Sequence, residues 1–194
     1  MQNTIQEKLP VFFRYFPHLF PLITKLNQNN IWWLIGGSGC LFLHGNDRKP
    51  GDVDILLPNN QHETADNLFD IKSYIITSNT QSVRNSNPYN NHSLQLTSHL
   101  EIRVNDHIFT FDYGDIQVQE KAMLVPFQDQ LVRIAPPEDA LIIKAILQRG
   151  VNEGKQDLED INNFLEISPD IDKKYLQSRI NNLGARDRTA GILG

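Results

Sequence analysis

Residues 32–58, WWLIGGSGCLFLHGNDRKPGDVDILLP, decide the fold of this 194-residue chain. The apolar run over 31–35 has the composition of a short buried strand. It ends at Gly36, Gly37 and Ser38, and glycines at such a turn let the backbone approach a phosphate closely. The stretch therefore predicts a strand that leads directly into a phosphate-binding turn.

Two carboxylates, Asp52 and Asp54, open a second predicted strand over 53–57. Residues i and i+2 of a strand project to the same face, so the two carboxylates are expected side by side, with Val53 and Ile55 pointing into a core. Adjacent carboxylates repel each other, and one takes up a proton unless a cation lies between them. Hard oxygen ligands favour Mg²⁺ or Mn²⁺, and Mg²⁺ often completes its coordination with phosphate oxygens. The pair therefore predicts a metal site beside the glycine turn.

This two-part pattern resembles the nucleotidyltransferase superfamily that is related to DNA polymerase beta. In that family, an apolar residue and Gly-Gly or Gly-Ser are followed, after a gap, by Asp-apolar-Asp/Glu-apolar. Gly37-Ser38 and then Asp52-Val53-Asp54-Ile55 fit this order, with the gap at the long end of the family's range. The resemblance implies an α+β fold, in which a nucleotidyltransferase-like mixed β-sheet is flanked by helices and followed by a helical C-terminal part.

The resemblance also implies a reaction. A nucleoside triphosphate would be the substrate and Mg²⁺ (or Mn²⁺) the cofactor, and a nucleoside monophosphate would move to an acceptor hydroxyl of a protein, a tRNA or a small molecule, with release of pyrophosphate. Asp52 and Asp54 would be the catalytic residues and metal ligands, and Gly36, Gly37 and Ser38 would bind the nucleotide. The alternative from another class is a non-catalytic nucleotide-binding module or a regulatory module of toxin–antitoxin type.

The family usually has a third carboxylate on a later strand that faces the pair. Glu101 and Asp112 both lie between apolar residues in predicted strands. We favour Glu101 as the third catalytic residue and metal ligand, because its strand comes earlier and family order places this carboxylate soon after the pair. Gln95 is a further candidate for the same position. An amide there would be a neutral, weaker ligand, and would leave two carboxylates only.

The segment 136–165 resembles small bacterial nucleotidyltransferases of abortive-infection type. The shared features are a Pro-Glu-Asp helix start at 137–139, Lys144, Arg149 and a Lys-x-Asp-x-x-Asp segment over 155–160. The resemblance implies that the lysines lie near the nucleotide phosphates. Lys144 sits in a very apolar helix, where a lysine needs a partner or a ligand. It is therefore expected either to bind the nucleotide or to form an ion pair, and the charges over 155–160 are expected to stabilise a helix end.

Periodicity and turn residues predict the remaining elements and two parts of the chain, 1–134 as a nucleotidyltransferase-like α/β domain and 135–194 as a helical part packed on it. Segment 78–92 is polar and either borders the active site or forms a plain surface loop, and the tail after Gly184 is expected to be loose. Strands are expected over 71–77, 94–104, 107–113 and 130–134. Helices are expected over 17–28, 62–69, 136–149 and 155–166. One more helix is expected after these, with Ser168 as its N-cap and Pro169 as its first residue.

Composition agrees with an enzyme domain. Hydrophobic residues make up 40 % and charged residues 21 %, which is typical of a globular chain. A net charge of −5 without a long basic run gives no strong nucleic-acid signal. The single cysteine, Cys40, excludes an internal disulfide and suits a reducing compartment. We find neither a signal peptide nor an apolar run of the roughly 18 residues that a membrane span needs. A cytoplasmic protein is expected, with a protein partner left open.

Overall fold

The computed structural model describes residues 2–90, 93–168 and 171–193. Its centre is a β-sheet, and the expected α+β class is confirmed. The strands are β1 (Leu34–Ile35), β2 (Val53–Leu56), β3 (Tyr74–Thr77), β4 (Gln81–Ser86), β5 (Leu94–Val104), β6 (His107–Phe111), β7 (Met123–Phe127) and β8 (Gln130–Ile134).

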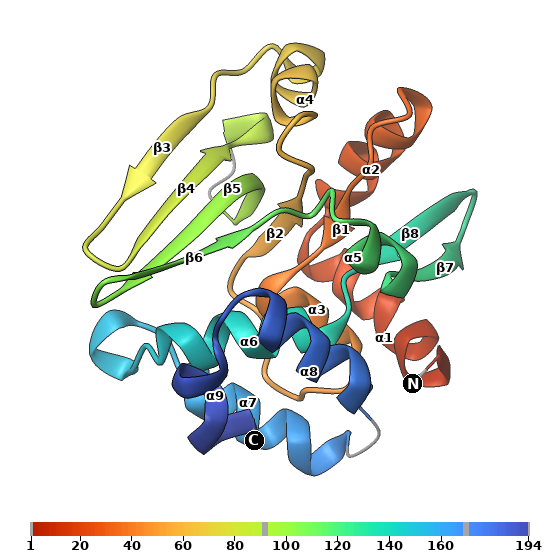
Figure 1. The fold of residues 1–194 in the computed structure, drawn as a ribbon. Coiled ribbons are helices and arrows are strands. Elements are labelled where there is room, and N and C mark those ends of the chain that lie inside the picture. The colour runs from red at the N-terminus through yellow and green to blue at the C-terminus, as the bar shows by residue number, and fades with distance from the viewer. Residues whose placement is uncertain (1, 91–92, 169–170, 194) are drawn as a thin grey trace.

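The helices complete the framework around this sheet. They are α1 (Gln2–Tyr15), α2 (Leu19–Gln28), α3 (Gly37–Leu43), α4 (His62–Phe69), α5 (Ile116–Lys121), α6 (Pro137–Leu147), α7 (Asp157–Ile167), α8 (Lys173–Asn182) and α9 (Arg186–Leu193), with short 3₁₀ turns at Pro88–Asn90 and Val151–Glu153. In Figure 1, α6 to α9 cluster below the sheet, while α1 and α2 lie beside β7 and β8.

The strand order is β3-β4-β5-β2-β1-β8-β7, and β6 pairs with the C-terminal half of β5. β1 and β2 are antiparallel, with Ile35 opposite Ile55, so the glycine turn that follows β1 lies next to the start of β2. β2 and β5 are parallel, with Asp54 opposite Gln95. The sheet therefore brings segments that are far apart in the sequence to one place.

A β-bulge interrupts β5. Ser82 of β4 is opposite Glu101, and Arg84 is opposite Ser98, so two steps on β4 correspond to three on β5. The extra residue lies near His99, whose φ of 51° is in the left-handed region. A bulge reverses the alternation of side chains beyond it. Residues after the bulge therefore face the side opposite to the one that simple alternation from Gln95 predicts.

The C-terminal helices are built around α6, most of whose side chains are buried. Two acids in its first turn hold α8 in place. Glu138 accepts a hydrogen bond from the backbone N–H of Asp172 at 2.7 Å, and Asp139 accepts one from Arg179 Nε at 2.9 Å. Buried carboxylates need such partners, so these contacts fix α8 against the helix that borders the site.

Several expected elements are confirmed, and the helix at 62–69 and the strands at 94–104 and 130–134 have the predicted ends. The prediction of a loop over 78–92 is wrong for 81–86, which form β4. Alternate side chains of β4, those of Gln81, Val83 and Asn85, line a cavity, and two of these three are polar, so the strand lacks the usual apolar pattern.

The ends of the C-terminal helices also differ from expectation. The tail after Gly184 is not loose, because α9 buries Thr189 and Leu193 and Arg188 Nε donates to the Ile146 carbonyl at 2.9 Å. Ser168 caps the end of α7 and not the start of the next helix. That next helix is capped by Asp172, and the predicted role of Pro169 lies outside the described residues.

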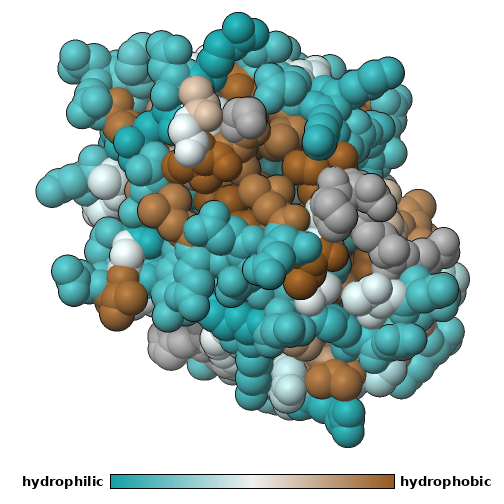
Figure 2. All heavy atoms as spheres, turned by 90° about the horizontal axis from the view of Figure 1, so that it is seen from below, coloured by the Kyte–Doolittle hydropathy of each residue, from teal (hydrophilic) through white to brown (hydrophobic). Residues whose placement is uncertain are grey.

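Figure 2 shows a largely hydrophilic surface on the face seen from below, with apolar residues gathered around one hollow. Exposed apolar patches often mark contact sites for other proteins. A protein partner stays a prediction. Within the described ranges, the helices are all too short or too polar to cross a membrane.

Two buried histidines make the fold sensitive to acid. His44 Nε2 lies 3.3 Å from the Ala135 carbonyl, and His62 contacts the Ser98 hydroxyl through Nδ1 at 2.6 Å. Burial lowers the pKa of each histidine to about 4. In the unfolded chain a histidine binds a proton near pH 6.5, so the unfolded state takes up protons first as the pH falls. The free energy of unfolding therefore falls between pH 6.5 and pH 4.

We predict that His44→Gln weakens this pH dependence by up to about 1.4 kcal/mol per pH unit, the linkage of one proton. Urea unfolding at pH 6.5, 5.5 and 4.5 measures the slope for each protein. His107→Gln, which changes an exposed histidine on β6, is the matched control and should keep the wild-type slope. Equal slopes for the two variants would contradict this role for His44.

Candidate functional site

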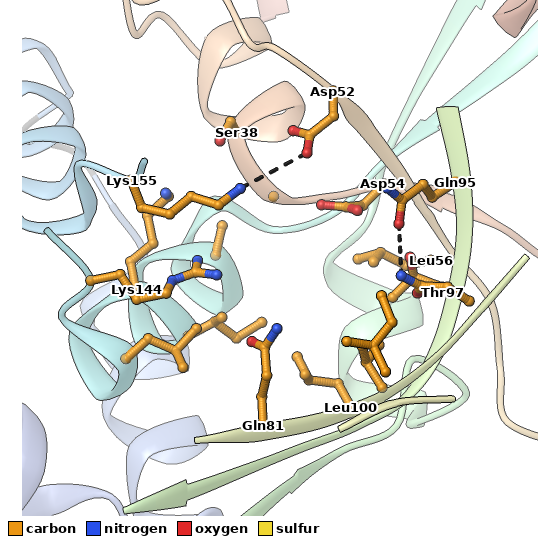
Figure 3. Close-up of a pocket in the computed structure, with 18 of the residues that line it drawn as sticks. Ser38, Asp52, Asp54, Leu56, Gln81, Gln95, Thr97, Leu100, Lys144 and Lys155 are labelled. Carbon is orange, nitrogen blue, oxygen red and sulfur yellow. Dashed lines mark hydrogen bonds and ion pairs between the residues drawn. The ribbon is translucent and has the colours of Figure 1, made fainter. Parts of the chain in front are cut away.

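A cavity of about 280 Å³ lies between the sheet and α6 (Figure 3). Its walls come from the glycine turn, from β2, β4 and β5, and from α6 with the segment that follows it. Asp52 and Asp54 enter from the glycine-turn side, and Lys144 and Lys155 from the helical side. The cavity thus collects groups from every segment that the sequence patterns singled out.

The two aspartates lie together, as the strand spacing predicts. Both line the cavity, and in Figure 3 their carboxylates project into it from neighbouring positions. Asp52 keeps 38 % of its side chain exposed, and its Oδ2 lies 3.9 Å from Lys155 Nζ. Lys155 therefore supplies a positive charge to the pair from the segment before α7.

The pKa of Asp54 is raised to about 6. Burial is the largest cause and the negative charge of Asp52 comes next, while Lys155, Arg149 and Lys144 lower the pKa. Three nearby cations thus offset only part of the cost of placing two carboxylates together. A further positive charge between the aspartates would remove the repulsion, so the pair is a site that fits a cation.

The glycine turn packs directly against this pair. Gly36 donates its N–H to the Asp54 carbonyl at 2.9 Å. Gly37 has a φ of +54°, and a Cβ atom on it would lie 2.7 Å from Asp54 Oδ2, while one on Gly36 would lie 2.2 Å from Leu56. A side chain at either position would meet these atoms, and at Gly37 the left-handed backbone conformation disfavours a side chain as well. Ser38 follows on the cavity wall, as the predicted phosphate-binding turn requires.

The position beside Asp54 on the neighbouring strand is occupied by Gln95, which also lines the cavity. Beyond the bulge, Leu100 lines the cavity, and Glu101 instead pairs with Arg103 at 3.0 Å. Asp112 Oδ1 accepts hydrogen bonds from backbone N–H groups, including that of Gly114 at 2.9 Å. The structure thus brings neither of these two carboxylates to the aspartate pair.

Lys144 forms ion pairs. Its Nζ lies 3.0 Å from Asp157 and 2.8 Å from Asp160, and both carboxylates are buried at the start of α7. Asp157 also accepts from Arg149 Nε at 2.9 Å, and Asp160 binds Arg48. Of the two expectations for Lys144, the structure shows the ion pair. Its contact with a nucleotide stays a prediction, because Lys144 also borders the cavity.

Asp157 and Asp160 do more than stabilise a helix end. The pKa of each is lowered by its cations, although burial alone would raise it. Two acids hold three cations, Arg48, Lys144 and Arg149, that come from the loop before the aspartate pair and from α6 and its C-terminal extension. This ion cluster joins the helical part to the loop before the aspartate pair and keeps the positive groups at the cavity.

Sequence reasoning did not assign a role to Asn85, Thr97 or Tyr113, all of which line the cavity. Residues 81, 83 and 85 alternate along the chain as strand residues on one face do, which could have indicated Asn85. The segment is so polar, however, that its composition predicts a loop. Among the residues that the structure describes, no cluster of three or more His, Cys, Asp or Glu side chains has the arrangement of a metal site. Any cation at the pair would therefore take its other ligands from elsewhere.

No protein-family model and no curated protein matches the sequence. Solved structures do match the fold. TM1012 of Thermotoga maritima, assigned as a nucleotidyltransferase, has a TM-score of 0.54 at 15 % identity over 79 % of this chain and 93 % of its own. ANT(2″)-Ia in complex with adenylyl-2″-tobramycin has a TM-score of 0.53 at 10 % identity over 88 % of this chain and 97 % of its own.

At such low identity these likenesses concern the fold alone. They agree with the mixed sheet and its flanking helices. The chain therefore has the nucleotidyltransferase fold.

Proposed function

We propose that the protein is a magnesium-dependent nucleotidyltransferase, which moves a nucleoside monophosphate from a nucleoside triphosphate to an acceptor hydroxyl and releases pyrophosphate. One observation carries the proposal: Asp52 and Asp54 lie side by side against a glycine turn, in a cavity that also receives Arg149 and Lys155. Carboxylates for a cation and cations for phosphates thus border one space.

The chemistry of the pair fits Mg²⁺ or Mn²⁺. Burial and, after it, the negative charge of Asp52 raise the pKa of Asp54. The two carboxylates provide hard oxygen ligands that a bound cation would neutralise. Asp52 and Asp54 would hold the metal, and phosphate oxygens would complete its coordination. When bound, the ion would neutralise charge on the transferring phosphoryl group.

The remaining groups have separate tasks. Gly37 and Ser38 would bind the phosphates through their backbone amides and the Ser38 hydroxyl. The acceptor oxygen would form a bond to the α-phosphorus as the bond from that phosphorus to the bridging oxygen of pyrophosphate breaks. Pyrophosphate would leave toward Arg149 and Lys155, which stabilise its charge. The hydroxyl proton would pass to a carboxylate oxygen of the pair that does not hold the metal.

The structural neighbour ANT(2″)-Ia supports transfer chemistry on this fold, because it is seen with adenylyl-2″-tobramycin. Its acceptor is not carried over to this chain. Fold alone does not determine an acceptor, which depends on the groups that line the site.

A second candidate function is nucleotide binding without catalysis, as in a regulatory module of toxin–antitoxin type. The observation that favours it is Gln95, a neutral amide where a third carboxylate would complete the pair. With two carboxylates only, the site would bind a metal–nucleotide complex less firmly and with less charge compensation during transfer. Turnover of the nucleoside triphosphate is expected of the nucleotidyltransferase and not of the regulatory module.

We predict that the four ribonucleoside triphosphates raise the melting temperature only with Mg²⁺, and that Asp52→Asn and Asp54→Asn abolish this shift. Binding of the nucleotide to the folded state alone causes the stabilisation. Glu101→Gln is the matched control, and it should keep the wild-type shift because its carboxylate pairs with Arg103 outside the cavity.

Pyrophosphate release from the best-bound nucleotide then tests transfer. An extract of the cells in which the protein occurs supplies the acceptor. If the nucleotide binds with Mg²⁺ and no pyrophosphate is released, the result favours the regulatory module. If no nucleotide shifts the melting temperature of the wild type, both candidates are wrong. Loss of the shift in Glu101→Gln would instead return Glu101 to the site.

Removal of one carboxylate should stabilise the metal-free protein. Because Asp54 is buried beside Asp52, we predict that Asp54→Asn raises the free energy of unfolding by about 1–2 kcal/mol at pH 7.5 in EDTA. At pH 4.5 the wild-type Asp54 carries a proton in the folded state, so the difference should shrink. Urea unfolding at the two pH values measures it.

Asp52→Asn serves as the comparison for this variant. Its side chain is 38 % exposed and lies near Lys155, so its loss should stabilise the protein less. An Asp54→Asn variant that is less stable than the wild type in EDTA would show that the pair carries no stored repulsion, and would remove the argument for a cation.

A further inference from the structure

Two polar groups on the cavity wall have no partner. Asn85 Oδ1 and Thr97 Oγ1 are buried without a hydrogen bond, although the two residues are only 5 % and 7 % exposed and both line the cavity. A buried polar atom without a partner costs on the order of 1–3 kcal/mol. Because the unpaired donor and acceptor lie at the wall of a cavity, a ligand in the cavity would supply the missing hydrogen bonds.

The two residues are held rigidly on neighbouring strands. Asn85 of β4 is directly opposite Thr97 of β5 in the sheet. Asn85 Nδ2 donates to Gln95 Oε1 at 2.6 Å, which turns the Asn85 carbonyl oxygen away from that contact. The wall therefore offers one hydroxyl donor, on Thr97, beside one carbonyl acceptor, on Asn85. This pair is complementary to the C=O and N–H of an amide.

The position of this wall suits the acceptor and not the leaving group. In Figure 3, Lys144 and Lys155 lie on one side of the cavity, while Gln95 and Thr97 lie on the other side, next to Asp54. In-line displacement requires the attacking oxygen to enter opposite the leaving pyrophosphate. If pyrophosphate leaves toward the cations, the attacking hydroxyl comes from the side of Thr97.

The residues around Asn85 and Thr97 indicate what charge a ligand of these two side chains carries. Leu56, Val83 and Leu100 line the same cavity, and among the lining residues that the structure describes, Asp52 and Asp54 are the only carboxylates. Both of these are assigned to the metal. An ammonium group that left water here would find no counter-charge, so a polycationic acceptor such as tobramycin does not fit.

We propose that Asn85 and Thr97 form the acceptor subsite, and that the acceptor is an uncharged hydroxyl side chain of a peptide, held by an adjacent amide. This inference rests on the proposed transfer function and names its substrate class. A nucleic acid is disfavoured because the chain has a net charge of −5, and Arg149, one of the cavity's cations, is already paired with Asp157.

The test uses the full chain with methyl-labelled Leu and Val, loaded with Mg²⁺ and a non-hydrolysable nucleoside triphosphate. N-acetyl-tyrosinamide is the neutral probe, and tyrosinamide at pH 6.5 is its cationic counterpart, because its α-amine is then protonated. We expect the neutral probe to shift the methyl signals of Leu56, Val83 and Leu100 with at least tenfold higher affinity than the cation.

Thr97→Val removes the hydroxyl and keeps the shape of the side chain. It should weaken binding of the neutral probe at least tenfold, leave the Mg²⁺–nucleotide thermal shift intact, and keep or raise the melting temperature, because the hydroxyl has no partner in the protein. Thr110→Val, at an exposed position on β6, is the matched control and should bind the probe as the wild type does.

Four results would overturn the proposal: no methyl shift up to the solubility limit, equal or tighter binding of the cation, unchanged binding in Thr97→Val, or a clear drop in its melting temperature. If Thr97→Val loses the thermal shift with Mg²⁺ and nucleotide while Thr110→Val keeps it, Asn85 and Thr97 contact the nucleotide and not the acceptor. Absence of a nucleotide shift in the wild type is a separate result, which contradicts the proposed function itself.

Discussion

The close approach of Gly37 to the Asp54 carboxylate is the contact on which the site depends. A Cβ atom at Gly37 would lie 2.7 Å from Asp54 Oδ2, so the turn and the carboxylate share a space that only a glycine leaves open. The antiparallel pairing of β1 with β2 sets this distance. It places the glycine turn and the two carboxylates on the wall of one cavity. Burial and the nearby charge of Asp52 raise the pKa of Asp54, and a cation between the two carboxylates would relieve this cost.

The buried ion cluster gives the cavity its opposite wall. Asp157 and Asp160 of α7 bind Lys144 of α6 and also Arg149 and Arg48. Removing one partner of such a cluster would leave an uncompensated buried charge, which is strongly destabilising. The cluster therefore fixes the helical part against the loop that carries Asp52, and it keeps positive groups facing the carboxylates. Fold and proposed chemistry use the same residues here.

Local patterns made the glycine turn and the aspartate pair predictable, because strand alternation and the lack of a glycine side chain are properties of neighbouring residues. The position of Glu101 was not predictable in this way. The bulge at His99 shifts the alternation, so Leu100 borders the cavity and Glu101 does not. The polar strand β4 and the helix α9 were missed for a related reason: their formation depends on a cavity and on a neighbour, α6, that the local sequence does not reveal.

Anomalous scattering from crystals grown with Mn²⁺ and an α,β-methylene nucleoside triphosphate would test most directly whether the aspartate pair is a metal–nucleotide site. A manganese peak between Asp52 and Asp54, with phosphates against Gly37 and Ser38, is the predicted result. Manganese bound elsewhere, or a nucleotide that lies away from the glycine turn, would contradict it.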